Sequence, residues 1–194
     1  NGERIGVDVA SGKVLWKDNY MREHGGKPDE AYNLIVDHEG NYWVLTNMHT
    51  FVYDQAAKQW YPSVNSFFEA HGIAPLPDPM QIWDVMVDKR GWLWIGTDHE
   101  GIFVVNMKSK EVKQFKNNKS DETSLSDNTV RHLMADRSGN VWISGYRSGL
   151  NQYIETLSGF RTLEMGDINT TVEDAPGNYW LGSDHRGIVK STPK

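Results

Sequence analysis

The stretch Asp136-Arg-Ser-Gly139-Asn-Val-Trp142 decides the fold, because its pattern of Asp, Gly and Trp occurs four times in this 194-residue chain. The other copies are Asp37-His-Glu-Gly40-Asn-Tyr-Trp43, Asp88-Lys-Arg-Gly91-Trp-Leu-Trp94 and Asp174-Ala-Pro-Gly177-Asn-Tyr-Trp180. Successive aspartates are 51, 48 and 38 residues apart. A period of about 40–50 residues indicates a solenoid or a propeller. Residues that recur are therefore expected to be structural, and residues that break the repeat are candidates for function.

Each copy predicts a tight turn between two strands. The aspartate side chain can accept hydrogen bonds from the backbone amides that follow it, and the glycine supplies the positive φ of the turn. Short segments rich in β-branched and aromatic residues lie on both sides. The recurring tryptophan stands in the second strand, and we expect its ring to pack between neighbouring repeats.

Two more short strands follow each copy, and four antiparallel strands per repeat are typical of a β-propeller blade. The predicted fold class is therefore all-β, with a single β-propeller region over residues 1–194. The predicted blades are residues 31–62, 82–116 and 129–164, with partial blades at 1–20 (last strands) and 168–192 (first strands). The two ends could complete one blade of a four-bladed ring, or the chain could be a slice of a larger propeller, which we favour. The only helical structure expected is about one turn, at residues 64–70.

The composition excludes several classes of function. A net charge of −6 and an isoelectric point near 5.6 give no basic field, so nucleic acid is not an expected partner. The absence of cysteine excludes disulfides and thiolate chemistry. No run approaches the ~18 apolar residues of a membrane span. The chain begins Asn1-Gly-Glu-Arg, so we interpret it as a processed or excised piece.

The third repeat extends to Ser124-Leu-Ser-Asp-Asn before its first strand and Gly149-Leu after its second, and it resembles the two-component regulator propeller repeat. Trp94-Ile-Gly-Thr97 and Trp180-Leu-Gly-Ser183 match the same pattern, whereas Trp43-Val-Leu-Thr46 lacks the glycine. The resemblance implies the periplasmic sensor region of a hybrid two-component histidine kinase. It further implies an oligosaccharide or other small-molecule ligand, a homodimer in the full-length receptor, no catalysis, no cofactor and no metal. Membrane attachment would come only through segments outside this chain.

Polar residues cluster in the turn after the second strand of each repeat. In a propeller these turns gather on one face around the channel, where they could contact a ligand. The candidate ligand-binding residues are Asp98, His99, Glu100, Tyr146, Arg147, Asp184, His185 and Arg186, with Trp83 on an inner strand. A plain alternative is that they are solvated turn residues and that Trp83 is a packed ring. The polar segment 117–127 is expected to be a solvated loop between blades.

Two other functions stay open. Streptogramin lyase-like propellers use a metal and a histidine, and His99, His185 and Glu100 would be the corresponding candidates here. The segment Val7-Asp-Val-Ala-Ser-Gly-Lys-Val-Leu-Trp16 resembles the repeat of quinoprotein-like scaffold propellers. The fold alone does not decide among a sensor, an enzyme and a scaffold.

Overall fold

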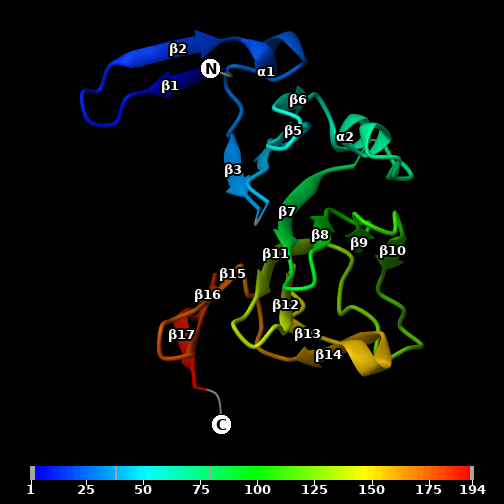
Figure 1. Ribbon diagram of the computed structural model, residues 1–194. Helices are drawn as coiled ribbons and strands as arrows, with labels where there is room; N and C mark the ends of the chain where they lie inside the picture. Colours follow the sequence, from blue (N-terminus) through cyan, green and yellow to red (C-terminus); the bar gives the residue numbers. More distant parts are fainter. Residues whose placement is uncertain (1–2, 38, 79, 193–194) are drawn as a thin grey trace. The chain divides into compact units, whose positions relative to one another are not determined.

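The structure, a computed structural model, describes residues 3–37, 39–78 and 80–192, and its strands form five antiparallel sheets (Figure 1). The chain divides into two compact units, residues 1–71 and 72–194. We call them the N-terminal unit and the C-terminal unit. This arrangement confirms the all-β class that the repeat predicts.

The N-terminal unit holds two of the sheets and two short helices. Its two-stranded sheet pairs β1 (Arg4–Val7) with β2 (Val14–Asp18), and its four-stranded sheet has the order β3-β4-β5-β6. The remaining elements of this unit are α1 (Tyr20–Glu23), β3 (Asn33–Val36), β4 (Tyr42–Leu45), β5 (Thr50–Asp54), β6 (Gln59–Tyr61) and α2 (Val64–Ala70).

Helix α2 occupies the segment in which about one helical turn was predicted. Ser63 caps its first turn, since its side chain accepts from the Ser66 backbone amide while the Ser66 side chain accepts from the Ser63 amide. Phe67 of this helix packs edge-on against Trp43, with 5.5 Å between ring centroids. The helix therefore covers the repeat tryptophan of its own unit.

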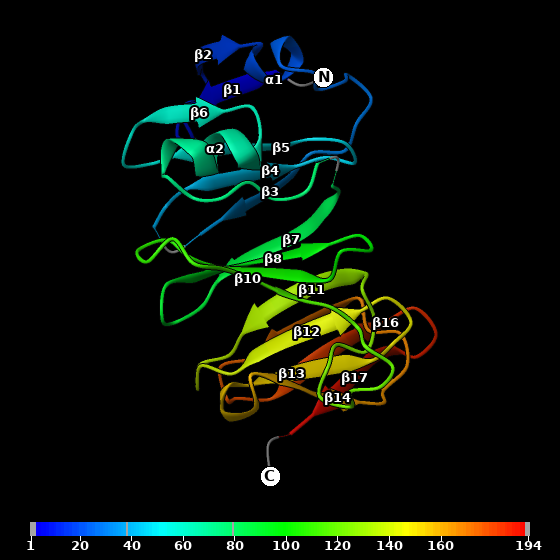
Figure 2. The same cartoon turned by 90° about the vertical axis from the view of Figure 1, so that its right-hand side faces the viewer.

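The C-terminal unit holds three sheets that follow one another along the chain. They have the orders β7-β8-β9-β10, β11-β12-β13-β14 and β15-β16-β17 (Figure 2). Their strands are β7 (Ile82–Val87), β8 (Trp92–Thr97), β9 (Ile102–Asn106), β10 (Val112–Phe115), β11 (Val130–Ala135), β12 (Val141–Gly145), β13 (Leu150–Ile154), β14 (Gly159–Leu163), β15 (Thr170–Glu173), β16 (Tyr179–Ser183) and β17 (Gly187–Ser191), with the 3-10 turn η1 (Glu155–Leu157) before β14.

The repeated Asp and Trp close one hydrogen-bonded corner in every repeat. In the third repeat, Asp136 Oδ1 accepts from the Asn140 backbone amide at 2.8 Å, and Asp136 Oδ2 accepts from Trp142 Nε1 at 2.9 Å. The indole-to-carboxylate bond recurs at 2.8–2.9 Å in the other three copies. A charge-assisted bond of this kind holds both the turn and the ring. The spacing of six residues thus fixes the rotamer of the tryptophan as well as the turn.

Two of the repeat tryptophans, Trp94 and Trp142, pack against residues of the next repeat. Trp94 is fully buried in a core with Leu133 and Val141 of the next sheet, and its ring meets Tyr153 edge-on at 5.1 Å. Trp142 packs in the same way with Leu181 of the third sheet and with Ile168, which precedes that sheet in the chain. Trp180 belongs to the last sheet described and is 37% exposed. Its ring is therefore not buried between two sheets, although the repeat predicts that position.

The segment 117–127 lies in the loop between β10 and β11, and residues 118–123 are exposed as predicted, but the loop is also anchored to the core. Leu125 is buried in the same core as Trp94. Asn117 Nδ2 donates to the Leu125 carbonyl oxygen at 2.6 Å, and the Phe160 amide donates to the Thr123 carbonyl oxygen at 2.6 Å. One apolar residue in a polar stretch thus anchors the loop.

Gly101 gives a direct test of the sheet geometry, because it immediately precedes β9 and has a φ of +75°. A Cβ built there would lie 2.1 Å from the backbone oxygen of Phe115. We expect Gly101→Ala to destabilise the C-terminal unit by well over the ~1–2 kcal/mol that left-handed strain alone costs. Gly91→Ala is the matched control, since its φ is +79° but no atom lies within 4 Å of the added Cβ. Equal losses of unfolding free energy for Gly101→Ala and Gly91→Ala in denaturant titrations would contradict a steric clash at Gly101.

Candidate functional site

The candidate turns of the C-terminal unit lie at one end of its sheets. Ile82, which begins β7, pairs with Thr97 at the end of β8, so the turn after β8 lies beside the start of β7. The Asp98 amide accordingly donates to the Gln81 carbonyl oxygen at 2.9 Å, and the Tyr146 amide donates to the Thr129 carbonyl oxygen at 2.8 Å. The Asp-x-x-Gly turns lie at the opposite end. The turns that hold the predicted ligand-binding residues and the repeat corners therefore lie at opposite ends of the sheets.

Trp83 and Arg131 occupy equivalent positions on the inner strands β7 and β11, five residues before the repeat aspartate. The pairing of each strand shifts there, between Ile82 and Asp84 in β7 and between Val130 and His132 in β11. A β-bulge leaves one residue outside the ladder and redirects its side chain, and bulges are common next to functional sites. A β-bulge at the equivalent position thus redirects the side chain of Trp83 in β7 and that of Arg131 in β11.

These two residues form a stack with two of the predicted turn residues. The Arg131 guanidinium carbon lies 4.2 Å from the centroid of the Trp83 ring and 4.8 Å from that of Tyr146. The Arg147 guanidinium carbon lies 5.0 Å from the Tyr146 centroid. We call Trp83, Arg131, Tyr146 and Arg147 the cation–aromatic stack. Cations over aromatic rings attract through the ring quadrupole, so the four side chains hold one another in place.

Asp98, His99 and Glu100 are engaged in local pairs beside the stack. Asp98 accepts from Thr129 Oγ1 at 3.2 Å and lies 3.0 Å from His99 Nδ1, while the His99 side chain is 79% exposed. Glu100 pairs with Lys116 at 3.0 Å. The hydrogen bond from Lys116 and its positive charge lower the pKa of Glu100. Glu100 therefore stays ionised and is held by Lys116.

The third candidate turn is separately tied to the start of its own sheet. Asn169, which stands at the position of Trp83 and Arg131 in the last repeat, donates from Nδ2 to Asp184 Oδ1. His185 Nε2 lies 3.3 Å from Asp167 Oδ2, and its side chain is 80% exposed. Arg186 is exposed. Within the described part of the chain, no hydrogen bond, ion pair or ring contact joins Asp184, His185 or Arg186 to the cation–aromatic stack.

Sequence reasoning missed Arg131, which is central to the stack. It is not part of the repeat motif, and a single arginine on a strand carries no signal of its own. Its equivalence to Trp83, counted back from the repeat aspartate, is the signal that could have identified it. Thr129 was also missed, although it bonds to both Asp98 and Tyr146 and so joins the turns of two neighbouring sheets.

A polar chain links the inner strands of the three sheets. Asp84 on β7 is buried; its Oδ2 accepts from the Leu133 amide at 2.8 Å and lies 2.8 Å from His132 Nδ1 on β11. His132 Nε2 lies 3.1 Å from the Thr171 carbonyl oxygen on β15. Burial lowers the pKa of His132, but the hydrogen bond and charge of Asp84, with the Thr171 carbonyl, outweigh it and raise the pKa overall. The imidazolium is thus stabilised between two acceptors.

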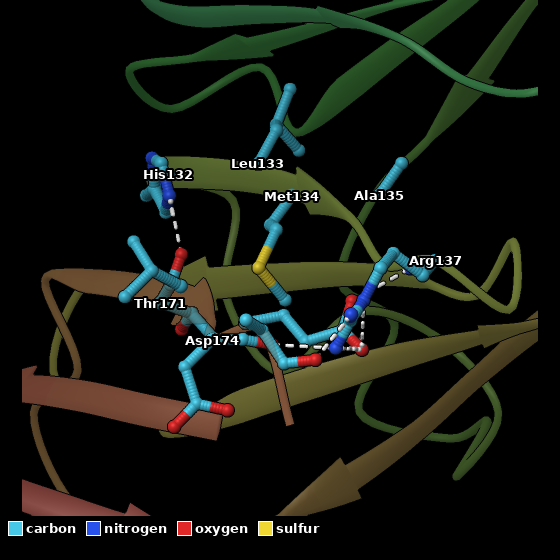
Figure 3. Close-up of a pocket in the computed structure, with 10 residues that line it drawn as sticks. His132, Leu133, Met134, Ala135, Arg137, Thr171 and Asp174 are labelled. Carbon is cyan, nitrogen blue, oxygen red and sulfur yellow. Dashed lines mark hydrogen bonds and ion pairs between the residues drawn. The ribbon is translucent and has the colours of Figure 1, made fainter. Parts of the chain in front are cut away.

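An open pocket of about 480 Å³ runs along β11 and β15, and His132 and Thr171 of the polar chain line part of it (Figure 3). Figure 3 shows the Met134 side chain between the two strands, with His132 and Thr171 at one end and Arg137 at the other. Arg137 Nε donates to Glu173 Oε1 at 3.1 Å, and Arg137 Nη1 donates to the Ala175 carbonyl oxygen at 2.6 Å. The arginine of this pocket is therefore already bound to groups of the chain itself.

The N-terminal unit contains an aromatic pocket of about 380 Å³. Trp16, Tyr42, Tyr53 and Trp60 line it, together with Arg4, Asp18 and Gln55. Arg4 stacks 4.6 Å from the Trp60 centroid and pairs with Asp18. The segment Val7–Trp16 forms the hairpin of β1 and β2 beside this pocket. These aromatic side chains make a second surface with residue types that are common in ligand-binding sites.

The enzymatic alternative gains no support from the arrangement of its candidate residues. Among the residues that the structure describes, no three His, Asp or Glu side chains gather closely enough to hold a metal ion. His99 and His185 each pair with a different aspartate. No helix in the described part of the chain is long and apolar enough to cross a membrane.

Sequence comparison identifies the repeats. The sequence profile of the two component regulator propeller matches residues 75–99 and 124–147. These segments run from before β7 to the first candidate turn and from before β11 to the second, so both bulges and all four residues of the stack lie within them. No curated protein matches the chain by sequence.

Structure comparison finds the same architecture in larger proteins. The extracellular domain of BT3049 from B. thetaiotaomicron, described as a hybrid two component system, superposes with a TM-score of 0.64 at 20% identity, over 96% of this chain and 22% of that one. The extracellular domain of BT4673 from the same organism, described as a one component system, gives 0.67 at 18% identity, over 98% and 25%. This chain thus spans about a quarter of their length. Virginiamycin B lyase from Staphylococcus aureus gives 0.54 at 12% identity, over 87% and 57%, a likeness of fold alone.

Proposed function

Because residues 75–99 and 124–147 are two-component regulator propeller repeats, we propose that this chain is part of a ligand-sensing propeller of a hybrid two-component histidine kinase. In this proposal the propeller lies in the periplasm, binds a small molecule such as an oligosaccharide and carries out no catalysis itself. The histidine kinase and the membrane segments would lie elsewhere in the full-length receptor.

The observation that carries the proposal is the cation–aromatic stack. Its four side chains come from two inner strands and one turn of the matched repeats, and none of them serves the repeat corners. Aromatic rings with polar tips and planar cations are enriched in binding surfaces because they combine apolar area with directed donors. Asp98, His99 and Glu100 would border this surface, while Asp184, His185 and Arg186 would bind only a ligand long enough to reach the next sheet.

Signalling would follow from a shift in population. In a homodimeric receptor, a ligand that binds one arrangement of the subunits more tightly favours that arrangement by its difference in affinity. No other driving force is needed, since the sensor passes on a change of equilibrium. The proposal therefore requires neither a cofactor nor a reactive residue in this chain.

Calorimetric titration of the chain with a panel of neutral and acidic oligosaccharides tests the proposal. We expect at least one to bind, and Tyr146→Ala to weaken it about tenfold or more, since the variant removes one ring and the support of two guanidinium groups. Trp180→Ala is the matched control, because Trp180 is a partly exposed aromatic residue outside the stack. Absence of heat across the panel, or equal loss in both variants, would contradict sensing at this surface.

A further inference from the structure

We propose that the ligand bound at the cation–aromatic stack carries a carboxylate or sulfate group, and that Arg131 and Arg147 bind that group. This inference rests on the proposed sensing function and specifies its ligand class as an acidic saccharide. Three features support it: the way in which the guanidinium groups are held, the lack of an acidic partner for either, and the missing acceptor beside Trp83.

The stack leaves the edge of each guanidinium available while its face is covered. Arg131 lies over the rings of both Trp83 and Tyr146, and Arg147 lies over Tyr146. A guanidinium carries five N–H donors in its plane, and stacking on a ring uses the face without using these donors. The donors therefore remain for an acceptor that approaches in the plane, and carboxylate and sulfate oxygens fit that edge in pairs.

Other arginines in similar settings have acidic partners. Arg4 pairs with Asp18, Arg90 with Asp88 and Glu155, and Arg137 with Glu173. Arg4 and Arg90 are also stacked on aromatic rings, so stacking does not prevent such pairing. Within the described part of the chain, neither Arg131 nor Arg147 has a hydrogen-bond acceptor or an acidic partner. Arg131 and Arg147 thus differ from Arg4 and Arg90, which stack on aromatic rings and also pair with a carboxylate.

The indole N–H of Trp83, itself part of the stack, also has no partner among the described residues. Trp83 Nε1 is buried and has no acceptor among the residues that the structure describes. Buried polar groups in folded proteins nearly always find a partner, and an exception calls for an explanation. Because Trp83 contacts Arg131, the donors of both side chains that lack acceptors in the described part of the chain lie together at this end of the stack. An anionic ligand would supply acceptors where the chain supplies none.

The backbone holds this arrangement before any ligand arrives. The bulges fix where Trp83 and Arg131 leave their strands, and Arg147 has a left-handed φ of 55° in the turn after β12. Side chains placed in advance lose less freedom on binding, which favours affinity. A left-handed non-glycine residue in a turn beside a stacked arginine is consistent with a binding role for that turn.

The test compares trigalacturonic acid with its uncharged methyl ester by calorimetric titration at low salt, with inorganic sulfate as a second probe. We expect the acid to bind, the ester to bind about tenfold more weakly or worse, and sulfate to compete with the acid. Affinity for the acid should fall as sodium chloride is raised, because the contacts are between charges.

Variants assign the effect to named side chains. Arg131→Gln and Arg147→Gln should each weaken the acid about tenfold, and Arg131→Lys should fall between Arg131→Gln and the unchanged chain. Arg161→Gln is the matched control, since Arg161 is an exposed strand arginine that contacts Gln152 away from the stack. Far- and near-UV circular dichroism checks that each variant is folded, and Arg131→Lys retains the stacked cation should Arg131→Gln unfold.

Three outcomes separate this inference from the proposed function. Equal binding of the acid and the ester, lost in Tyr146→Ala, would overturn the anionic ligand and leave sensing at this surface intact. Binding of the acid that Arg131→Gln and Arg147→Gln do not change would overturn the assignment to these residues. No heat with the acid and with sulfate would overturn this inference, and no heat across the neutral panel as well would overturn the proposed function.

Discussion

Replacing Trp94 by alanine is expected to lower the free energy of unfolding of the C-terminal unit by about 3–5 kcal/mol, the usual cost of removing a large buried ring. Trp94 is fully buried in the core that joins the first two sheets of this unit. The substitution removes the ring, its edge contact with Tyr153 and the hydrogen bond from Nε1 to Asp88. The cavity would lie between two sheets and cannot collapse without moving one of them.

Trp180→Ala at the same repeat position is the matched control. The indole of Trp180 makes the same bond to its aspartate, at 2.8 Å, but its ring is 37% exposed and one face is near Lys190. We therefore expect a clearly smaller loss. Hydrogen–deuterium exchange of peptides from β7 to β17, read alongside denaturant titration, would measure both losses. Equal losses would mean that the corner bond, and not burial between sheets, is the main contribution of this tryptophan.

The second large effect is expected at Asp84. This buried carboxylate accepts from the Leu133 amide and pairs with His132, so Asp84→Ala leaves a buried N–H and a partly buried imidazole without their acceptor. The expected loss is about 2–4 kcal/mol of unfolding free energy in the C-terminal unit. A double-mutant cycle with His132→Ala would show how much of the loss belongs to the pair.

The Asp84–His132 pair also predicts a pH dependence with a definite sign. The pKa of His132 is raised above its ordinary value of about 6.5. The folded state therefore holds the proton more tightly than the unfolded state does. This contribution to stability is fully present below about pH 6.5 and is lost as the pH rises through the folded pKa.

Thermal unfolding between about pH 5 and 9 would measure this effect. The stability difference between the unchanged chain and His132→Gln should be largest at the acidic end and should shrink towards the alkaline end. In the Asp84→Asn background the pH dependence of that difference should largely disappear. A difference that grows with pH would show that His132 is neutral in the folded state.

The repeat motif was sufficient to predict the strands and corners of this fold. Asp136, Gly139 and Trp142 mark a turn and the strand after it, and the structure places both where the spacing predicts. The indole-to-carboxylate bond was not predicted, since it depends on side-chain rotamers that a spacing does not state. The exposure of Trp180 was not predictable either, because a repeat position does not state how much of a ring its neighbours cover.

The sequence predicted only part of the candidate site, for a related physical reason. Tyr146, Arg147 and Trp83 were identified as polar or aromatic breaks in the repeat, but what joins them is Arg131, whose role depends on a bulge. Bulges come from local backbone geometry and have no fixed residue signature. Contacts between neighbouring sheets, such as that from Asp84 to the Leu133 amide, join residues 49 positions apart and leave no periodic trace.

The corner bond between Asp and Trp has a consequence for how such a protein can grow by gene duplication. Each corner makes its turn bond and its indole bond within a stretch of seven residues, as Asp174, Asn178 and Trp180 do in the last repeat. A duplicated copy would therefore arrive with its turn and its tryptophan rotamer already specified, and only its side surfaces would need to adapt to a neighbour. Because these hydrogen bonds form within each copy, the number of copies can change while the Asp–Trp corner of each copy stays the same.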